Sequence, residues 1–328
     1  LIYFTRSGFF EVFSKDESIS SRILSMHPTC VCSTTFHTFI IGFRNGFISE
    51  FDSQMNLLTT YTLPGTFTAH NDMITQVGSC PQFHLMSIST DKSMHFWNSK
   101  GLHMSTITSN FMFTAFCVSS DYLWLADSRP RMYVYNLSSL NKSSKEKQSF
   151  KKLKSFDLSV PGIVVAMTPI GDGNACIAAM RDGMILILST SAILEILNPF
   201  SDHVRIINIC PLRVDFRTGL ISYAVVDSSG NFNLVALNHV VKNLGQIAPF
   251  FTSNETDIIS IRNGQIVRFN KKQLESDSVK RLPELDLPRS KIVQCLNYED
   301  ELQPWEEEEE EPEEEINDEQ DKEEDKSN

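Results

Sequence analysis

A short β-hairpin pattern recurs along this 328-residue chain, and it restricts the possible folds more than any other feature of the sequence. In its clearest form, two alternating apolar runs flank Asn-Gly or Asp-Gly, as in residues 40–52 and 177–188. These dipeptides favour two-residue hairpin turns in which both turn residues have positive φ. The sequence therefore predicts antiparallel strands joined by tight turns.

Seven hairpins of this kind are predicted, and they are spaced fairly regularly. Their second strands end near Phe13, Phe51, Trp97, Tyr135, Leu188, Ala236 and Phe269. The intervals between these ends run from 33 to 53 residues, around the ~40–45 residues of a four-stranded propeller blade. No segment keeps a helical period for long, whereas Val, Ile, Phe, Thr and Ser are abundant, so strands are expected throughout.

Residues 69–98 resemble one WD repeat of a β-propeller. The stretch begins with Ala69-His70, passes through two β runs to Asp91 in a turn, and ends with Trp97-Asn98. This order of His, strand, strand, turn Asp, strand and Trp is that of the repeat, with its Gly-His and Trp-Asp pairs altered. Through the spacing of the hairpins the resemblance covers residues 1–298, although most blades lack the signature residues. It implies an all-β, seven-bladed β-propeller with four-stranded antiparallel blades.

The two ends of the chain are predicted to share one blade. The chain begins inside a hairpin, and two extended segments, 279–287 and 291–298, follow the last hairpin. An innermost strand at 291–298 would complete the N-terminal blade and remove sheet edges that otherwise pair with other chains. Residue 1 is Leu rather than Met, so we expect a fragment or a processed product.

Charge divides the chain into a propeller domain, residues 1–298, and an acidic tail, residues 299–328. The tail contains 18 acidic residues and 2 lysines, whereas the first 298 residues contain 27 Lys+Arg and 23 Asp+Glu. A run such as 306–315 repels itself and has little apolar surface to bury, so the tail is expected to be disordered. The lysine-rich stretch 138–155 is expected to be a mobile loop.

Composition and cysteine spacing exclude several classes of protein. No apolar run approaches the ~18 residues of a membrane span, and no basic-then-apolar signal opens the chain. The seven cysteines show neither Cys-x-x-Cys nor zinc-type spacing, which predicts free, buried thiols in a reducing compartment. We therefore expect an intracellular protein, cytoplasmic with the nucleus as the alternative, that uses no metal or cofactor.

His70, Ser87, Ser89, Asp91 and Trp97 include the residue types of a catalytic Ser/His/Asp set. The resemblance to a WD repeat implies another role, in which the His, a strand hydroxyl, the turn Asp and the Trp N–H form one structural hydrogen-bond network. A catalytic triad also needs a nucleophile in a cleft with an oxyanion hole, and neither G-x-S-x-G nor H-E-x-x-H occurs in the sequence. We predict the structural role and no enzymatic activity.

Basic residues recur at the predicted hairpin turns. In a propeller these turns emerge on one face, around the mouth of the channel, so the sequence predicts a broken ring of positive charge there. Arg pairs well with carboxylate and phosphate groups, which favours acidic or phosphorylated partners. The alternative is that these residues pair locally as ordinary turn residues. The candidates are Arg6, Arg44, Lys92, Arg129, Arg131, Arg181 and Arg262.

The sequence thus predicts a non-catalytic scaffold that binds protein or peptide partners on one propeller face. The acidic tail has two possible roles. It only solubilises the chain, or it is a ligand that binds either this face or basic proteins. Nucleic acid is disfavoured as a direct partner because the tail would repel phosphates. One alternative is the C-terminal propeller module of a larger trafficking protein of the BEACH class, or of a ciliary or ribosome-assembly protein. A propeller enzyme is the less favoured alternative.

Overall fold

The computed structural model describes most of the chain up to Lys280, and within the described residues the chain forms 26 β-strands and one α-helix. The acidic tail and the predicted closing strand at 291–298 lie outside the described residues. The described ranges are 2–4, 9–14, 17–34, 38–80, 82–119, 121–137, 151–170, 173–200, 204–215, 220–237, 239–248, 251–253, 256–262 and 265–280.

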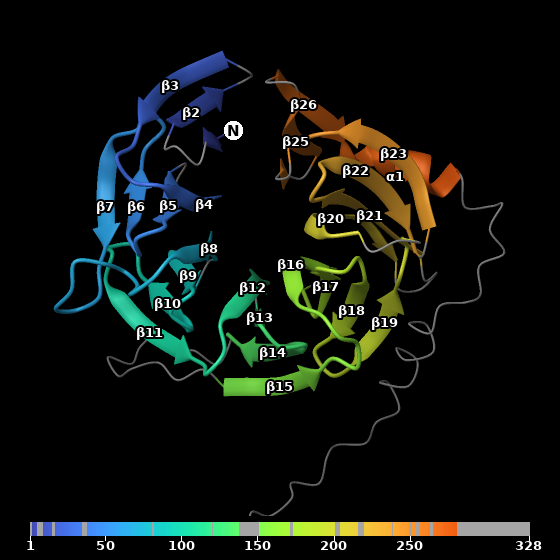
Figure 1. Ribbon diagram of the computed structural model, residues 1–328, viewed down its shortest axis with the longest axis horizontal. Coiled ribbons are helices and arrows are strands. Elements are labelled where there is room, and N and C mark those ends of the chain that lie inside the picture. The colour runs from blue at the N-terminus through green and yellow to red at the C-terminus, as the bar shows by residue number, and fades with distance from the viewer. Residues whose placement is uncertain are drawn as a thin grey trace, which may run out of the picture.

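Antiparallel sheets follow one another around a central axis, like the blades of a propeller (Figure 1). Five of them have four strands, and in each the spatial order of the strands is their order in the chain. Strands β4, β8, β12, β16 and β20 lie innermost, nearest the axis (Figure 1). The five sheets are β4–β7 (Pro28–Ser33, Phe39–Phe43, Ile48–Phe51, Leu57–Tyr61), β8–β11 (Ile74–Gly78, Leu85–Ser89, Ser93–Trp97, His103–Thr108), β12–β15 (Phe113–Val118, Tyr122–Asp127, Arg131–Asn136, Lys151–Asp157), β16–β19 (Val164–Ile170, Ala175–Met180, Ile185–Ser189, Ile193–Leu197) and β20–β23 (Ile206–Asp215, Leu220–Asp227, Asn231–Ala236, His239–Gln246).

Two further sheets, at the two ends of the described chain, have three strands each and are neighbours in the ring (Figure 1). The predicted all-β propeller architecture is confirmed. The shared blade and the count of seven complete blades stay predictions, because residues 281–298 are outside the described part of the chain. The two sheets are β1–β3 (Ile2–Phe4, Phe9–Ser14, Glu17–Ile23) and β24–β26 (Thr252–Ser253, Asp257–Arg262, Gln265–Asn270).

Each predicted hairpin is present as an antiparallel strand pair, but the turns differ from the prediction. In the β5–β6 turn, Gly46 has a φ of 81° whereas Asn45 does not have positive φ, and Gly46 N donates to Phe43 O at 3.3 Å. This is a four-residue turn with one left-handed residue at its end, not a two-residue turn with two. Gly183 and Gly230 take the same position in their turns.

The hydrophobic core lies between neighbouring sheets rather than within any one of them. Ile177 and Ile187 of one blade, for example, belong to the same buried cluster as Ile209 and Tyr223 of the next. Burial on both faces explains why the middle strands are almost continuously apolar, since each sheet is covered by a blade on either side. The outermost strands are more exposed, as in β7.

Polar contacts also join neighbouring blades. Glu50 of β6 accepts hydrogen bonds from Thr38 and Tyr61 of its own blade, and its Oε2 lies 3.0 Å from Nε2 of His84 in the next blade. Burial alone would raise the pKa of Glu50, but these partners outweigh it and lower the pKa below its ordinary value. The Glu50 cluster therefore links two blades at the end of the strands opposite to the Asn-Gly turns.

Two segments differ from the sequence predictions. Helix α1 (Lys271–Lys280) includes the start of the segment that was predicted to be extended from residue 279. Asn270 Oδ1 accepts from Gln273 N at 3.2 Å and so caps the helix, while Leu274 is buried on its inner face. Residues 151–155, predicted to be part of a mobile loop, belong to the outermost strand β15, where Lys152 and Lys154 are exposed at the edge of the sheet. Residues 138–150 are outside the described residues.

Candidate partner-binding face

The hairpin turns and the segments that enter the innermost strands form one surface, which we call the turn face. In five blades, the residue directly after the second strand donates its N–H to the carbonyl oxygen of the residue directly before the first strand. This repeated bond brings every turn to the same end of its blade as the entering segment. The bonds are Arg44 N to His27 O, Thr90 N to Met73 O, Ser128 N to Met112 O, Arg181 N to Ile163 O and Ser228 N to Arg205 O, at 2.8–3.0 Å.

In four of these five blades, the turn also accepts a hydrogen bond from the segment that leaves the outermost strand of the same blade. Gly46 O accepts from both Ala69 N and His70 N, at 3.0 and 3.1 Å. A Cβ on Gly46 would lie 2.2 Å from His70 O, so no other residue fits without a shift of the backbone. Lys92 O accepts likewise from Ser109 N at 3.1 Å. The turn face is therefore a rigid belt of turns and connecting segments that are joined through their main chains.

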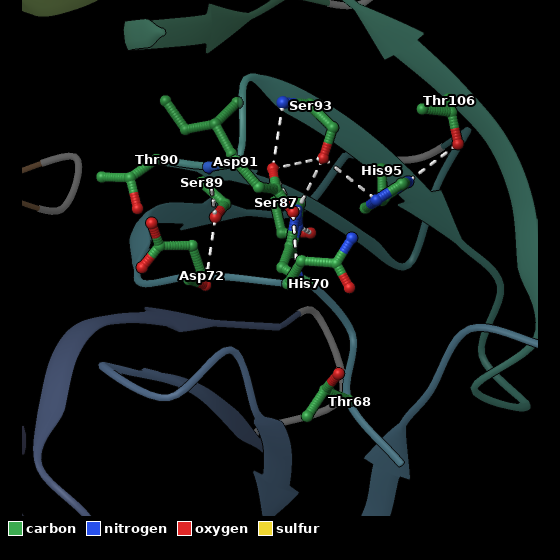
Figure 2. Close-up of polar contacts among 12 residues, drawn as sticks. Thr68, His70, Asp72, Ser87, Ser89, Thr90, Asp91, Ser93, His95 and Thr106 are labelled. Atoms are coloured by element: carbon green, nitrogen blue, oxygen red, sulfur yellow. Dashed lines mark hydrogen bonds and ion pairs between the residues drawn. The ribbon is translucent and has the colours of Figure 1, made fainter. Parts of the chain in front are cut away.

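His70 lies at the centre of a buried hydrogen-bond network in the β8–β11 blade (Figure 2). Its Nδ1 is 3.0 Å from Asp91 Oδ2, and its Nε2 is 2.8 Å from Ser87 Oγ. The same Ser87 hydroxyl accepts from Trp97 Nε1 at 3.2 Å. Ser89 Oγ lies at the turn, where it accepts from Asp91 N at 3.1 Å. These contacts connect the entering segment, two strands and the turn of one blade.

The network continues through residues that the sequence analysis missed. Ser93 Oγ donates to Asp91 Oδ1 at 2.6 Å and lies 3.1 Å from His95 Nε2. His95 Nδ1 is in turn 2.8 Å from Thr106 Oγ1 (Figure 2). His103 Nε2 also lies within 2.8 Å of Thr106 Oγ1. The polar chain thus runs from the buried His70 across β10 to the outermost strand β11.

Burial and charge shift the pKa values of two members of this network. Burial alone would raise the pKa of Asp91, but the hydrogen bonds from His70 and Ser93 and the charge of His70 outweigh it and lower the pKa well below its ordinary value. Burial lowers the pKa of His95 to about 3, and the nearby His70 and His103 add to this effect. Asp91 is therefore a stable anion, while His95 stays neutral over the physiological range.

The nitrogen and oxygen atoms of His70, Asp91 and His95 lie within 4.8 Å of one another and are the group in the described residues that could hold a metal ion. The Ser93 hydroxyl lies within 3.1 Å of an atom of each residue and so occupies the space between them. Hydrogen bonds thus account for all three side chains. Ser87 is fully buried, and its hydroxyl is bonded to His70 and Trp97, which is not the geometry of an exposed nucleophile.

The predicted basic residues divide into two groups. The side chains of Arg44, Lys92 and Arg181 are exposed on the turn face. Lys92 has a φ of 68° and takes the turn position that Gly46 has in the β5–β6 hairpin. Arg6 lies outside the described residues. Arg205, which the sequence analysis did not select, is a further exposed cation on this face, directly before β20.

The second group is held by partners within the propeller and consists of Arg129, Arg131 and Arg262. Arg129 donates to the fully buried Asp127 at 2.6 Å and to Tyr133 Oη at 2.7 Å, and its guanidinium carbon lies 3.6 Å from the centre of the Phe111 ring. Arg131 pairs with Asp157. Arg262 donates to the main-chain oxygens of Leu244 and Gln246, at 2.7 and 2.9 Å. For these three residues, pairing within the propeller explains the basic side chain.

Apolar side chains also reach the turn face. Phe67, in the segment between β7 and β8, is 87% exposed, the largest exposed fraction among the large hydrophobic residues that the structure describes. Its segment continues into Ala69 and His70, which are bonded to the Arg44 turn. Asn71 N donates to Asp91 Oδ2 in the Lys92 turn at 2.9 Å. Phe67 therefore lies two residues before a short stretch, residues 69–71, that is bonded to two turns that each carry an exposed cation.

Comparison with solved structures agrees with this geometry. The WD40 β-propeller domain of Doa1 superposes with a TM-score of 0.60 at 15% identity, over 81% of this chain and 87% of that one. The chain has the fold of a WD40-type β-propeller. U3-55K (TM-score 0.61, 15% identity, 79% and 83% of the two chains) has a similar structure. So does Sqt1 from Chaetomium thermophilum bound to the N-terminus of the ribosomal protein L10 (0.60, 13%, 82% and 80%).

At these identities the likeness concerns the fold. No family model and no curated protein matches the sequence of the WD40-type propeller. This agrees with the incomplete signature of its blades, since only the β8–β11 blade has His, Asp and Trp together in the described residues. Helix α1, the one helix in the described part of the chain, is not long and apolar enough to cross a membrane.

Proposed function

We propose that this propeller is a non-catalytic interaction scaffold that binds acidic segments of partner proteins on its turn face. The observation that carries the proposal is the balance of exposed charge on that face. Four cations from different blades, Arg44, Lys92, Arg181 and Arg205, have exposed side chains. The exposed carboxylates on the same described surface are Asp72 and Asp157, and Asp157 is already paired with Arg131.

The rigidity of the turn face supports a docking role. Because the turns are bonded through their main chains, the cations can be presented without a large loss of backbone entropy on binding. Guanidinium groups match carboxylate and phosphate groups with two parallel hydrogen bonds. Sqt1, which has the same fold, has been solved with the N-terminus of another protein bound, which supports recognition of a short segment of a partner protein. Membership of a larger trafficking, ciliary or ribosome-assembly protein stays a prediction from the sequence.

Charge reversal tests the proposal. A fluorescein-labelled peptide rich in Glu and Asp is titrated with the full chain, and binding is followed by fluorescence anisotropy. We expect Arg44→Glu with Arg181→Glu to weaken binding by at least about tenfold, and raised salt to weaken binding to the parent, because exposed charges are screened over ~8 Å at physiological ionic strength.

The matched control changes the same charge elsewhere. Lys100, in the turn between β10 and β11, and Lys272, in α1, are exposed and lie away from the turn face. Lys100→Glu with Lys272→Glu should leave the affinity within about twofold of the parent, because the net charge is the same but the local field is not. Equal losses in the two double variants, or no loss in either, would refute docking on the turn face.

A further inference from the structure

We infer that the chain's own acidic segment, residues 299–328, occupies the turn face and competes with partners there. This inference rests on the proposed function and identifies the first ligand of the same surface. The segment carries 18 carboxylates and 2 lysines, and it is covalently tied to a propeller whose turn face has mainly cations among its exposed charged side chains. The rest of the chain carries 27 Lys+Arg and 23 Asp+Glu, so its net charge is opposite in sign to that of the segment.

The length of the acidic segment permits the contact. It has thirty residues, and an extended chain of that length spans up to about 100 Å. Strands of 5–6 residues are about 17–20 Å long, which sets the height of a blade. The segment is therefore long enough to reach the turn face from either end of the blades.

An aromatic residue in the segment complements an aromatic residue on the face. Trp305 is followed directly by the run Glu306–Glu311. Phe67 is 87% exposed and lies two residues before Ala69, which is bonded to the Arg44 turn. Contact between the two rings would bury apolar surface while the carboxylates that follow meet the cations. We therefore place Trp305 against Phe67 in the bound state.

Tethering gives this contact an advantage over free partners. A short flexible linker holds a ligand at an effective concentration in the millimolar range. A partner acidic segment must then compete with the tail, so its apparent association constant is the intrinsic one multiplied by the fraction of time that the face is free. Neutralising the tail should strengthen partner binding without any change to the face itself.

Trp305 supplies a reporter for the contact. The chain has three tryptophans, and the other two, Trp97 and Trp124, are fully buried. Quenching of tryptophan fluorescence by acrylamide, which is uncharged, therefore reports on Trp305. In the full chain we expect the quenching constant to rise about twofold between about 20 and 300 mM NaCl, as salt releases the tail. Trp305→Phe should abolish this salt dependence.

Substitutions on the turn face test whether Trp305 contacts it. Arg44→Glu with Arg181→Glu should give the high quenching constant at all salt concentrations, while the control Lys100→Glu with Lys272→Glu should behave as the parent. Phe67→Ser should raise quenching at low salt, since it removes the surface on which Trp305 rests. A quenching constant that is independent of salt in the parent and unchanged by the Arg reversals would overturn the inference.

A second variant separates this inference from the proposed function. In it, residues Glu306–Glu311 are changed to Gln, and binding of the labelled acidic peptide is measured by anisotropy. We expect the neutralised chain to bind the peptide at least about threefold more tightly than the parent. If the parent and the neutralised chain bind equally well, the intramolecular contact is wrong and the proposed function stands. If neither chain binds the peptide, the proposed function itself fails.

Discussion

The side-chain amide of Gln76 in β8 makes two hydrogen bonds to the main chain of Phe116 in β12, one in each direction. Nε2 donates to Phe116 O at 2.9 Å, and Oε1 accepts from Phe116 N at 3.0 Å. The amide thus does between two blades what a neighbouring strand does within one. Asn208 of β20 makes a related bond, from Nδ2 to Phe251 O in the following blade at 3.2 Å.

Gln76→Ala should therefore lower the free energy of unfolding by about 2 kcal/mol, because two main-chain groups of Phe116 lose their partner. Gln76→Glu keeps an acceptor for Phe116 N but loses the donor to Phe116 O. It should therefore lose one hydrogen bond, whereas Gln76→Ala loses both. Urea denaturation of both variants measures the effect. A midpoint for Gln76→Ala equal to that of the parent would show that Phe116 finds other partners.

Loss of the buried network in the β8–β11 blade should be more damaging. Trp97 is fully buried, so Trp97→Ala should cost about 3–5 kcal/mol through the cavity that it leaves. His70→Ala removes hydrogen bonds to Asp91 and Ser87 and should cost about 1–3 kcal/mol. The melting temperatures of the two variants measure the two losses, and that of Trp97→Ala should be the lower. Unchanged melting temperatures in both would contradict the structural role of this network.

Two buried serines offer a matched comparison. Ser87 of β9 is bonded to His70 and Trp97, whereas Ser222 of β21 is fully buried and has a hydroxyl with no partner among the described residues. Ser87→Ala should destabilise by about 1–3 kcal/mol, and Ser222→Ala should be neutral or stabilise, because it removes an unsatisfied buried group. Chemical denaturation distinguishes them. A destabilised Ser222→Ala variant would reveal a hydrogen bond at that hydroxyl.

The neutral His95 should make stability depend on pH. In the unfolded chain its pKa returns to about 6.5, while in the folded protein it is lowered to about 3, with His70, His103 and Asp91 as its charged or titratable neighbours. Unfolding therefore takes up a proton at any pH between these values, so stability falls as the pH falls below 6.5. The lowered pKa of Asp91 adds a loss only below about pH 4.

We expect His95 to contribute a loss of about 2 kcal/mol between pH 6.5 and 4.5. Urea denaturation across this range measures the slope of stability against pH, and His95→Asn should flatten it. The control is His239→Asn, because His239 is exposed in β23. If the slope is the same in the His95 variant and in the parent, the network does not oppose protonation at this position.

Features whose residues lie close together in the sequence could be predicted from it. The seven hairpins, His70 with its turn Asp91, and Trp97 follow from residue order within about thirty residues. Gln76 could not be recognised, because its partner Phe116 lies forty residues away in the next blade. His95 and Thr106 meet only through the register between β10 and β11, which the sequence does not display.

The charged residues show the same limit. Local pairing of Arg129 had a visible signal, since Asp127 and Tyr133 stand two residues before it and four residues after it. Arg262 had none, because its partners are main-chain oxygens of the preceding blade. Arg205 was overlooked because it lies outside the hairpin turns, although its carbonyl oxygen is bonded to one of them. Turn position alone therefore does not separate exposed from engaged arginines.

Lys92 has a left-handed backbone at the turn position where three other blades have Gly46, Gly183 and Gly230. A side chain there is strained by roughly 1 kcal/mol relative to glycine. Lys92→Gly should thus make the fold more robust while it takes one positive charge from the turn face. A single substitution at position 92 should therefore raise stability and weaken partner binding at the same time, so at this residue the sequence favours the binding surface over the stability of the fold.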